Sequence, residues 1–331
     1  MTTEKKTVSI VIPARNEEQY ISRCLDSVIL ANDPSFELEV FVNDGCSSDR
    51  TREIVSQYSA KYPWIVLLEN RLRITSGGLN TGIRASRGEI VIILGAHSGI
   101  YPDFIKNCIL YLDRYPEAGC VGGIIENQYE DDRSESIGMA MSSAFGVGNA
   151  HFRTGTKEGF VDTVAFGAYR KEVFGEAGLF DETLVRNQDD EFNFRLLKMG
   201  YKIFLSHQIR SRYFVRTGFK KLFSQYFQYG YWKVIVNLKH KTITTLRQII
   251  PVLFVIFILI SIAGILINRY IFYGGSFVFL IYLITGFYFT GKFTKAIRKR
   301  LLILRAFITL HVSYGSGYLA GIVRSVFHLK P

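Results

Sequence analysis

Short apolar runs alternate with amphipathic segments along the first hundred residues of the chain. The runs have strand length and end at turn-forming residues, whereas the segments between them repeat apolar residues every three or four positions. The expected strands are 8–12, 38–42, 64–68 and 90–94, and the expected helices are 17–30, a segment starting at Ser48–Asp49, and 79–85. This order predicts an α/β fold for residues 1–215, with a mostly parallel, Rossmann-like sheet flanked by helices. Because ligands bind at the carboxyl ends of such strands, the loops 13–17, 43–49 and 95–101 are expected to form one site.

The pattern changes after residue 248. Residues 249–267 and 271–291 carry no charged side chain, and each is long enough to cross a hydrocarbon core of about 30 Å. We expect them to form a membrane hairpin rather than two buried helices of a soluble protein. A third apolar segment, 301–323, contains an arginine and a histidine, and this composition fits both a membrane span and an interfacial helix. Residues 249–331 are therefore predicted to be a membrane domain.

The charged residues support this division. The formal charge of the chain is +11, but all 29 Asp and Glu lie at or before Glu191. Residues 1–191 carry −10 because they contain 19 Lys and Arg, and residues 192–331 carry +21 because they contain 21 Lys and Arg. A soluble nucleic-acid-binding protein would explain the net charge, but not the basic residues that accompany uncharged segments of membrane length. We expect no nucleic-acid partner.

Two basic segments flank the predicted hairpin. Residues 216–248 are predicted to be an amphipathic juxtamembrane segment in contact with membrane lipids. Basic residues interleaved with aromatic ones lie just before and at the start of this segment: Arg210, Arg212, Arg216, Lys220 and Lys221. A basic loop at 292–300 follows the second span, and the positive-inside rule places this loop and residues 1–215 in the cytoplasm. The expected location is the inner or plasma membrane, with several passes.

Polar side chains stand at the end of one predicted strand. Asp44 ends a buried strand, where a carboxylate accepts protons from a nucleobase or a ribose hydroxyl, and Ser47, Ser48 and Asp49 follow it. The same residues also suit an Asx-turn and a helix N-cap, so both interpretations stay open. The four cysteines have no zinc-ligand spacing, and a reducing compartment is expected.

Several segments resemble the family 2 glycosyltransferases of the GT-A fold, in the order in which that family has them. They are Ser9–Glu18 (SIVIPARNEE), Asp44–Thr51 (DGCSSDRT), Leu79–Gly82 (LNTG) with Gly88–Glu89, and Gly178–Glu182 (GLFDE). Three others resemble the succinoglycan-type glucosyltransferases of exopolysaccharide assembly. These are Ala96–His97 with Tyr101–Pro102, Arg186–Glu191 (RNQDDE) and Gln225–Lys233 (QYFQYGYWK).

The resemblance implies roles for residues at the strand ends. It assigns nucleotide binding to Pro13, Arg15, Glu17, Asp44 and Asn80. It also implies that the loop after residue 94 handles the diphosphate, where the family has Asp-x-Asp or Asp-x-His and a Mg²⁺ or Mn²⁺ ion. Here Gly95 replaces the first Asp, so His97 is expected either to bind the metal or to donate to a phosphate oxygen, and a loop histidine with a structural hydrogen bond is the alternative.

A second chemical cluster lies at Asp189–Glu191. Inverting sugar transfer requires a base that takes the proton of the acceptor hydroxyl, and the family's acidic motif matches Asp189 to that base. Asp190 is the alternative if the match shifts by one residue. Glu191 and Arg195 are four residues apart on a helix and are expected to form an ion pair that orients the neighbouring loop. Without the resemblance, the acidic residues would indicate only a favourably charged helix start.

The segment that contains Gln225 and Trp232 resembles a looser form of the family's acceptor-side motif. The resemblance therefore implies a membrane-anchored inverting glycosyltransferase that moves one hexose, glucose in our hypothesis, from a UDP-sugar to a polyprenyl-diphosphate-linked glycan. This activity belongs to exopolysaccharide or cell-surface glycan assembly. A catalytically impaired nucleotide-sugar-binding scaffold is the alternative, because Gly95 leaves the metal motif incomplete.

Overall fold

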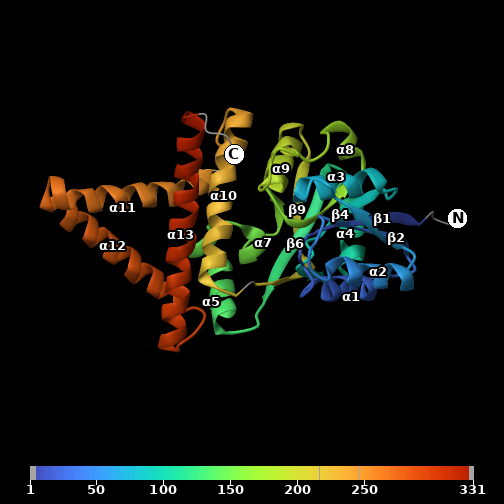
Figure 1. Ribbon diagram of the computed structural model, residues 1–331, viewed down its shortest axis with the longest axis horizontal. Coiled ribbons are helices and arrows are strands. Elements are labelled where there is room, and N and C mark those ends of the chain that lie inside the picture. The colour runs from blue at the N-terminus through green and yellow to red at the C-terminus, as the bar shows by residue number, and fades with distance from the viewer. Residues whose placement is uncertain (1–4, 216, 245, 328–331) are drawn as a thin grey trace. The chain divides into compact units, whose positions relative to one another are not determined.

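The computed structural model describes residues 5–215, 217–244 and 246–327, and Arg216 lies outside them. The described chain divides into two compact units (Figure 1). One contains the residues up to Glu126 together with Gly155–Phe214, and the other contains Asn127–Thr154 together with the residues from Val215 onwards. The domain expected at 1–215 is therefore interrupted, because residues 127–154 pack with the C-terminal helices.

The first unit is built on one mixed sheet. Its strands are β1 (Lys6–Ala14), β2 (Phe36–Asp44), β3 (Ile65–Glu69), β4 (Ile90–Ile93), β5 (Ser98–Ile100), β6 (Ala118–Gln128), β7 (Gly159–Val161), β8 (Ala165–Arg170) and β9 (Lys202–Phe214). The order is β3-β2-β1-β4-β8-β6-β9-β5, and β7 pairs with β9. The predicted parallel part, β3-β2-β1-β4, is confirmed. Strand β8 then joins β4 in the antiparallel direction, which the apolar pattern did not predict.

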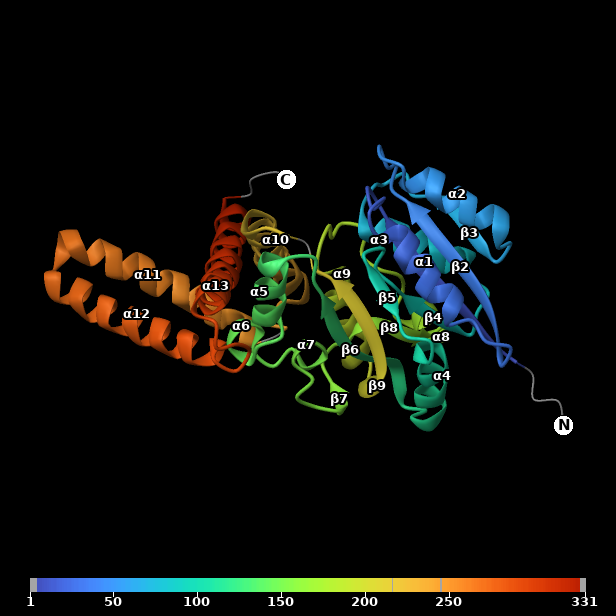
Figure 2. The same ribbon diagram turned by 90° about the horizontal axis from the view of Figure 1, so that it is seen from below.

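Helices cover both faces of this sheet (Figures 1 and 2). They are α1 (Ile21–Leu30), α2 (Thr51–Lys61), α3 (Thr75–Ala85), α4 (Phe104–Arg114), α8 (Glu172–Glu176) and α9 (Gln188–Lys198). Strand β1 is buried on both sides, as expected of a central parallel strand. Its residues Ile10 and Ile12 share a core cluster with Leu25 of α1. On the other face α3 approaches closely, since a Cβ at Gly82 would lie 2.5 Å from a methyl carbon of Val11.

The basic run that leads into the predicted juxtamembrane segment has a different structure from the one we expected. Arg210 and Arg212 lie on β9, and both guanidinium groups stack on the ring of Tyr101, 4.4 and 4.3 Å from its centroid. They therefore belong to the sheet and not to an amphipathic lipid-binding segment. The alternation of charged and apolar residues arises because neighbouring residues of a strand point to opposite faces.

The second unit is helical. Its helices are α5 (Asp132–Met141), α6 (Ala144–Val147), α7 (His151–Thr154), α10 (Phe219–His240), α11 (Ile250–Ile267), α12 (Arg269–Thr290) and α13 (Ile297–Val326), with a 3₁₀ turn at Leu246–Ile249. Helices α10 and α13 run side by side (Figures 1 and 2). Small residues bring their backbones together, because Gly317 of α13 lies against the carbonyl of Phe227 and Gly230 of α10 lies against that of Tyr314.

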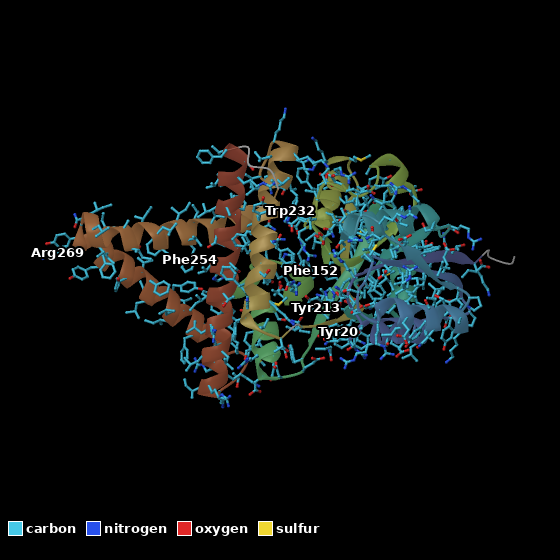
Figure 3. The ribbon with its side chains drawn as sticks, viewed as in Figure 1. Tyr20, Phe152, Tyr213, Trp232, Phe254 and Arg269 are labelled. Atoms are coloured by element: carbon cyan, nitrogen blue, oxygen red, sulfur yellow. The ribbon has the colours of Figure 1, made fainter. Side chains whose placement is uncertain are left out.

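Three helices of this unit have the length and composition of membrane spans: Arg247–Ile267, Arg269–Thr290 and Ile297–Val326. The three apolar segments predicted from the sequence are therefore confirmed as helices that could cross a membrane. Helices α11 and α12 form a hairpin, and Gly275 of α12 packs on Ser261 of α11. Arg269 lies at its far end (Figure 3).

Helix α13 contacts the base of this hairpin. Gly315 lies against the carbonyl of Pro251 in the first turn of α11, and the Arg300 guanidinium donates to the carbonyl of Phe287 at the end of α12, 2.8 Å away. The rest of the hairpin projects away from α13, which runs crosswise to it (Figures 1 and 2). A crosswise helix does not form a three-helix bundle with the hairpin. A membrane crossed by α11 and α12 would therefore not be crossed by α13 in the same direction.

Candidate active site

The loops that follow β1 and β2 are joined by backbone hydrogen bonds. The Gly45 N–H donates to the Ala14 carbonyl at 2.8 Å, and the Glu17 N–H donates to the Thr51 hydroxyl at 2.8 Å. Between them, the Asn16 N–H donates to the Ser47 hydroxyl at 2.9 Å. The two loops therefore meet at one edge of the sheet, as expected for the carboxyl ends of neighbouring parallel strands.

Asn16 is a site residue that the sequence analysis did not single out. Its φ of 56° lies in the left-handed region, which Asn tolerates better than most residues. In this conformation its side-chain oxygen accepts a hydrogen bond from the Ser48 N–H at 2.9 Å. The signal available in the sequence was an Asn within the loop 13–17, which follows a predicted strand.

Asp44 is completely buried at the end of β2. Both carboxylate oxygens accept from the Ser47 N–H, at 3.3 and 3.2 Å, so the local turn that the sequence left open is present. One oxygen also lies 3.9 Å from the guanidinium of the exposed Arg52. A carboxylate has about four acceptor positions, so the Asp44 carboxylate can accept further hydrogen bonds from a ligand.

Pro13 and Arg15 lie beside a third loop, the one that follows β3. The guanidinium of Arg15, which is exposed, donates to the Arg73 carbonyl at 3.2 Å. Pro13 lies against α3 where Gly78 allows close approach, since a Cβ at Gly78 would be 3.2 Å from the Pro13 Cβ. These contacts place both residues at the same edge as Asp44.

His97 and Glu17 meet at this edge. The His97 Nδ1 lies 3.5 Å from a carboxylate oxygen of Glu17, and their side chains are 27% and 10% exposed. The His97 ring packs edge-on against Tyr213 at a centroid distance of 5.2 Å. Burial, reinforced by the Glu17 charge, raises the pKa of the Cys24 thiol to about 12. The Cys24 thiol, which lies near this pair, is therefore uncharged. The loop after β4, which carries His97, joins the loops after β1 and β2, as predicted.

Glu17 and His97 offer only two ligands to a divalent cation. Among residues 5–215, 217–244 and 246–327, no three His, Cys, Asp or Glu side chains gather as a metal site. Glu17 and His97 supply one carboxylate and one imidazole. Such a pair fits Mn²⁺ better than Mg²⁺, which prefers oxygen ligands throughout, and it requires further ligands from the diphosphate itself.

Gly95, which replaces the usual Asp, lies under an aromatic ring. A Cβ at Gly95 would lie 3.2 Å from the Cε1 of Phe166. Phe166 itself has a φ of 49°, a rare conformation for an aromatic residue and a typical sign of local strain. The ring thus takes part of the space that a larger residue at position 95 would need. No sequence signal indicated Phe166, because its position depends on the antiparallel pairing of β8 with β4.

Asn80 on α3 is hydrogen-bonded to the loop that precedes α9. Its amide nitrogen donates to the Phe180 carbonyl and to a Glu182 carboxylate oxygen, both at 2.8 Å, and its oxygen accepts from the Phe180 N–H at 2.9 Å. Both amide hydrogens are therefore used within the protein. These hydrogen bonds hold the loop at Phe180 and Glu182 on α3, and the nucleotide-binding role implied by the resemblance stays a prediction.

Glu191 and Arg195 form the expected ion pair on α9. The Arg195 guanidinium lies 3.0 Å from both carboxylate oxygens of Glu191, which is completely buried. The same guanidinium donates to the carbonyls of Ala177 and Leu179, the latter at 2.7 Å. The pair therefore fixes the other end of the loop that Asn80 holds.

Asp189 and Asp190 lie in the first turn of α9, which begins after Asn187 in the left-handed conformation with a φ of 60°. Asp189 is exposed and Asp190 is half-buried. Burial raises the pKa of the Tyr169 phenol well above its ordinary value, and the charges of Cys120 and Asp189 add to the effect. The Tyr169 hydroxyl also donates to the Asn193 side-chain oxygen at 3.0 Å, so α9 packs against β8, the strand beside β4.

The two acceptor-side candidates belong to the second unit. Gln225 and Trp232 both lie on α10, and Figure 3 labels Trp232 there. The Gln225 amide donates to the Tyr229 hydroxyl at 2.9 Å, and the Trp232 indole N–H donates to the Gln228 oxygen at 3.1 Å. Each side chain is therefore paired one turn along its own helix.

Arg195→Gln should destabilise the first unit by about 3–5 kcal/mol, because it leaves the buried Glu191 carboxylate without its cation. Thermal or urea unfolding of the purified protein measures this change. Lys198→Gln is the matched control, since it removes an exposed charge from the same helix and should change stability by no more than about 0.5 kcal/mol. Equal stability of the two variants would show that the ion pair does not hold the loop.

Comparisons with known proteins agree with this geometry. The profile of the family described as "Glycosyl transferase family 2" matches residues 9–178. A Methanococcus voltae protein is 33% identical over 231 residues, which are 67% of this chain and 71% of that protein. Its name is "Dolichyl N-acetyl-alpha-D-glucosaminyl phosphate 3-beta-D-2,3-diacetamido-2,3-dideoxy-beta-D-glucuronosyltransferase". The "Succinoglycan biosynthesis protein ExoA" of Rhizobium meliloti (strain 1021) is 29% identical over 246 residues, 73% of each chain.

A solved structure supports the fold over nearly the whole chain. The mannosyltransferase PcManGT from Pyrobaculum calidifontis, in complex with GDP-Man and Mn²⁺, has a TM-score of 0.62 at 18% identity. The match covers 99% of this chain and 89% of the mannosyltransferase. Sequence and fold together show that the chain belongs to glycosyl transferase family 2 and is a glycosyltransferase.

Proposed function

We propose that the chain transfers one hexose, with inversion, from a nucleotide-diphosphate sugar to a polyprenyl-linked saccharide at a membrane surface. The observation that carries this proposal is the convergence of three strand-end loops on one edge of the sheet, where Asp44, Glu17 and His97 lie. The M. voltae relative is named for a dolichyl-linked sugar phosphate, which supports an acceptor of this class.

In this proposal the nucleotide lies over the ends of β1 and β2. Asp44 accepts hydrogen bonds from the base or the ribose. Arg15 and Pro13 lie beside the same part of the nucleotide. We propose UDP as the nucleotide and glucose as the sugar. GDP is the alternative nucleotide to test, because the P. calidifontis structure holds GDP-Man.

His97 and Glu17 lie where the diphosphate would be handled. A divalent cation bound there would neutralise part of the negative charge of the leaving diphosphate. A ring N–H of His97 can also donate a hydrogen bond to a phosphate oxygen directly, and Glu17 then fixes the orientation of the ring through the 3.5 Å contact. Both arrangements use the same two side chains.

Asp189 is proposed as the base. Its carboxylate takes the proton of the acceptor hydroxyl while the hydroxyl oxygen forms its bond to the anomeric carbon. On the opposite side of that carbon, the bond to the diphosphate oxygen breaks and the electron pair leaves with the nucleoside diphosphate. Glu191 and Arg195 act through the loop they hold and not on the reacting atoms.

The membrane part of the proposal concerns the second unit. The hairpin α11–α12 spans the bilayer, and the basic residues after it stay in the cytoplasm with the first unit. We place α13 along the membrane surface, because it crosses the base of the hairpin and carries arginines near both ends, at Arg298 and Arg324. Helix α10, with Gln225 and Trp232, is proposed to face the acceptor. The membrane is the inner or plasma membrane.

A donor panel with lipid-linked acceptors tests the reaction, read by mass spectrometry of the lipid product. We expect UDP-glucose to extend a polyprenyl-diphosphate-linked sugar by one hexose.

Asp189→Asn should preserve donor binding and reduce turnover by about 10²–10⁴-fold, because the amide cannot take the hydroxyl proton. Asp190→Asn, the matched control, should keep most of the rate. If only Asp190→Asn loses activity, the base is Asp190, and if neither variant does, the acidic motif is only a helix start.

His97→Ala should weaken binding of the donor and of UDP about tenfold or more, measured by calorimetry with and without Mn²⁺. Gly95→Asp should strengthen the metal dependence only when Phe166→Ala is also present, because the Phe166 ring lies 3.2 Å from the new Cβ. Activity in excess chelator equal to that in Mn²⁺ would assign His97 to direct phosphate contact. Unchanged donor affinity in His97→Ala would remove this residue from the site.

Cysteine labelling in sealed inverted vesicles tests the topology. In a Cys46→Ser background, which removes the one cysteine that is not fully buried, single cysteines at Arg50, Ala296, Phe327 and Asn268 are compared. Positions 50, 296 and 327 should be labelled from the same side, and position 268 from the other. Labelling of 296 and 327 from opposite sides would show that α13 spans the membrane. Labelling of 50 and 296 from opposite sides would refute the hairpin.

A further inference from the structure

A cavity of about 690 Å³ lies within the second unit, where α5, α10 and α13 begin. It is far larger than a single water site. Its lining is Asp131, Asp132, Arg133, Gly218, Phe219, Lys220, Arg298, Leu302 and Arg305. Four cationic side chains from three helices therefore face one space. None of these four side chains has a role in the reaction described above.

The two acidic residues of the lining offset only half of the four cationic charges. An Asp131 carboxylate oxygen accepts from the Ser134 N–H at 2.7 Å and from its hydroxyl at 2.8 Å, as the cap of α5. These hydrogen bonds, with a smaller contribution from the charge of Arg133, lower the pKa of Asp131, so it stays ionised in the lining. Asp132 lies 3.9 Å from the ammonium of Lys299, which does not line the cavity and which lies 2.5 Å from a carboxylate oxygen of Glu135. The four cations thus exceed the negative charge available to them.

The helix ends add to this positive charge. Helices α10 and α13, of 22 and 30 residues, both begin beside the cavity, at Gly218 and just before Arg298. Neither N-terminus is capped by a side chain within the described residues. The first N–H groups of a long helix carry partial positive charge and favour an anion.

Apolar surface adjoins the charged lining. The Arg305 guanidinium stacks on the Phe219 ring, 4.3 Å from its centroid. On the first turns of α13, Ile297 and Leu301 are 61% and 56% exposed, next in sequence to the lining residues Arg298 and Leu302. The same helix contacts the base of the apolar hairpin. A ligand with an anionic head and an apolar tail matches both surfaces.

We propose that this cavity binds the phosphate-bearing headgroup of a membrane lipid, with the lipid tail on the exposed apolar residues of α13. Arginine forks suit phosphate oxygens, and a headgroup with more than one phosphate would use more of the four cations. Two sources share this chemistry: an anionic phospholipid of the bilayer and the polyprenyl diphosphate of the acceptor. Only the second source rests on the proposed function.

The test measures lipid binding to the full-length protein in a nonionic detergent. The probes are dihexanoyl phosphatidylglycerol, farnesyl diphosphate, and dihexanoyl phosphatidylcholine as the zwitterionic reference. Arg298→Gln with Arg305→Gln should weaken binding of at least one anionic probe tenfold or more. Lys295→Gln, which removes an exposed charge outside the cavity, should leave binding unchanged. Arg133→Gln with Lys220→Gln is a second pair that avoids α13 and any folding defect there.

The probes separate the sources. A loss confined to phosphatidylglycerol assigns the site to a bilayer lipid, a loss confined to farnesyl diphosphate assigns it to the acceptor, and a loss of both assigns it to phosphate headgroups in general. Unchanged binding of both anionic probes in both variant pairs, with melting temperatures near that of the parent protein, overturns the proposal. Donor hydrolysis in the same samples reports on the proposed function separately, because it needs only the first unit's site.

Discussion

The register between β1 and β2 sets the geometry of the catalytic unit. Ala14 is paired with Asp44, so both strands end at the same level and their loops leave the sheet together. The bond from the Gly45 N–H to the Ala14 carbonyl then closes the gap between the loops. A shift of one residue would point the Asp44 side chain to the other face of the sheet. Strand β4, paired with the other side of β1, brings His97 to Glu17 under the same constraint.

The acidic motif depends on a second set of contacts, farther along the chain. Asn80 on α3 holds the loop at Phe180 and Glu182, and the Glu191–Arg195 pair holds the same loop at Ala177 and Leu179. Helix α9 is thereby connected to the parallel half of the sheet through side chains. Buried ion pairs are weak sources of net stability but are costly to break. We infer that this one serves to fix the position of the helix that carries Asp189.

In the second unit, the helices differ in composition and in how closely they pack. Helices α11 and α12 are apolar on all sides, which suits contact with lipid along most of their length. The α10–α13 pair is different, because glycines such as Gly317 and Gly230 let the two backbones approach closely. Four basic residues, Arg133, Lys220, Arg298 and Arg305, gather near the starts of these two helices and of α5. The charge asymmetry of the sequence thus has a local structural counterpart in a cationic cavity beside apolar surface.

The sequence by itself determined the parallel strands, the three apolar helices and the family, because these follow from local periodicity, from runs without charge and from short ordered motifs. It also predicted the Glu191–Arg195 pair, since four residues on a helix are one turn. Only the tertiary structure decided that Arg210 and Arg212 lie on β9, that Asn80 holds a loop, and that Phe166 lies over Gly95. These facts depend on antiparallel pairing and on contacts between residues about 70 to 110 positions apart, and no local pattern encodes such contacts.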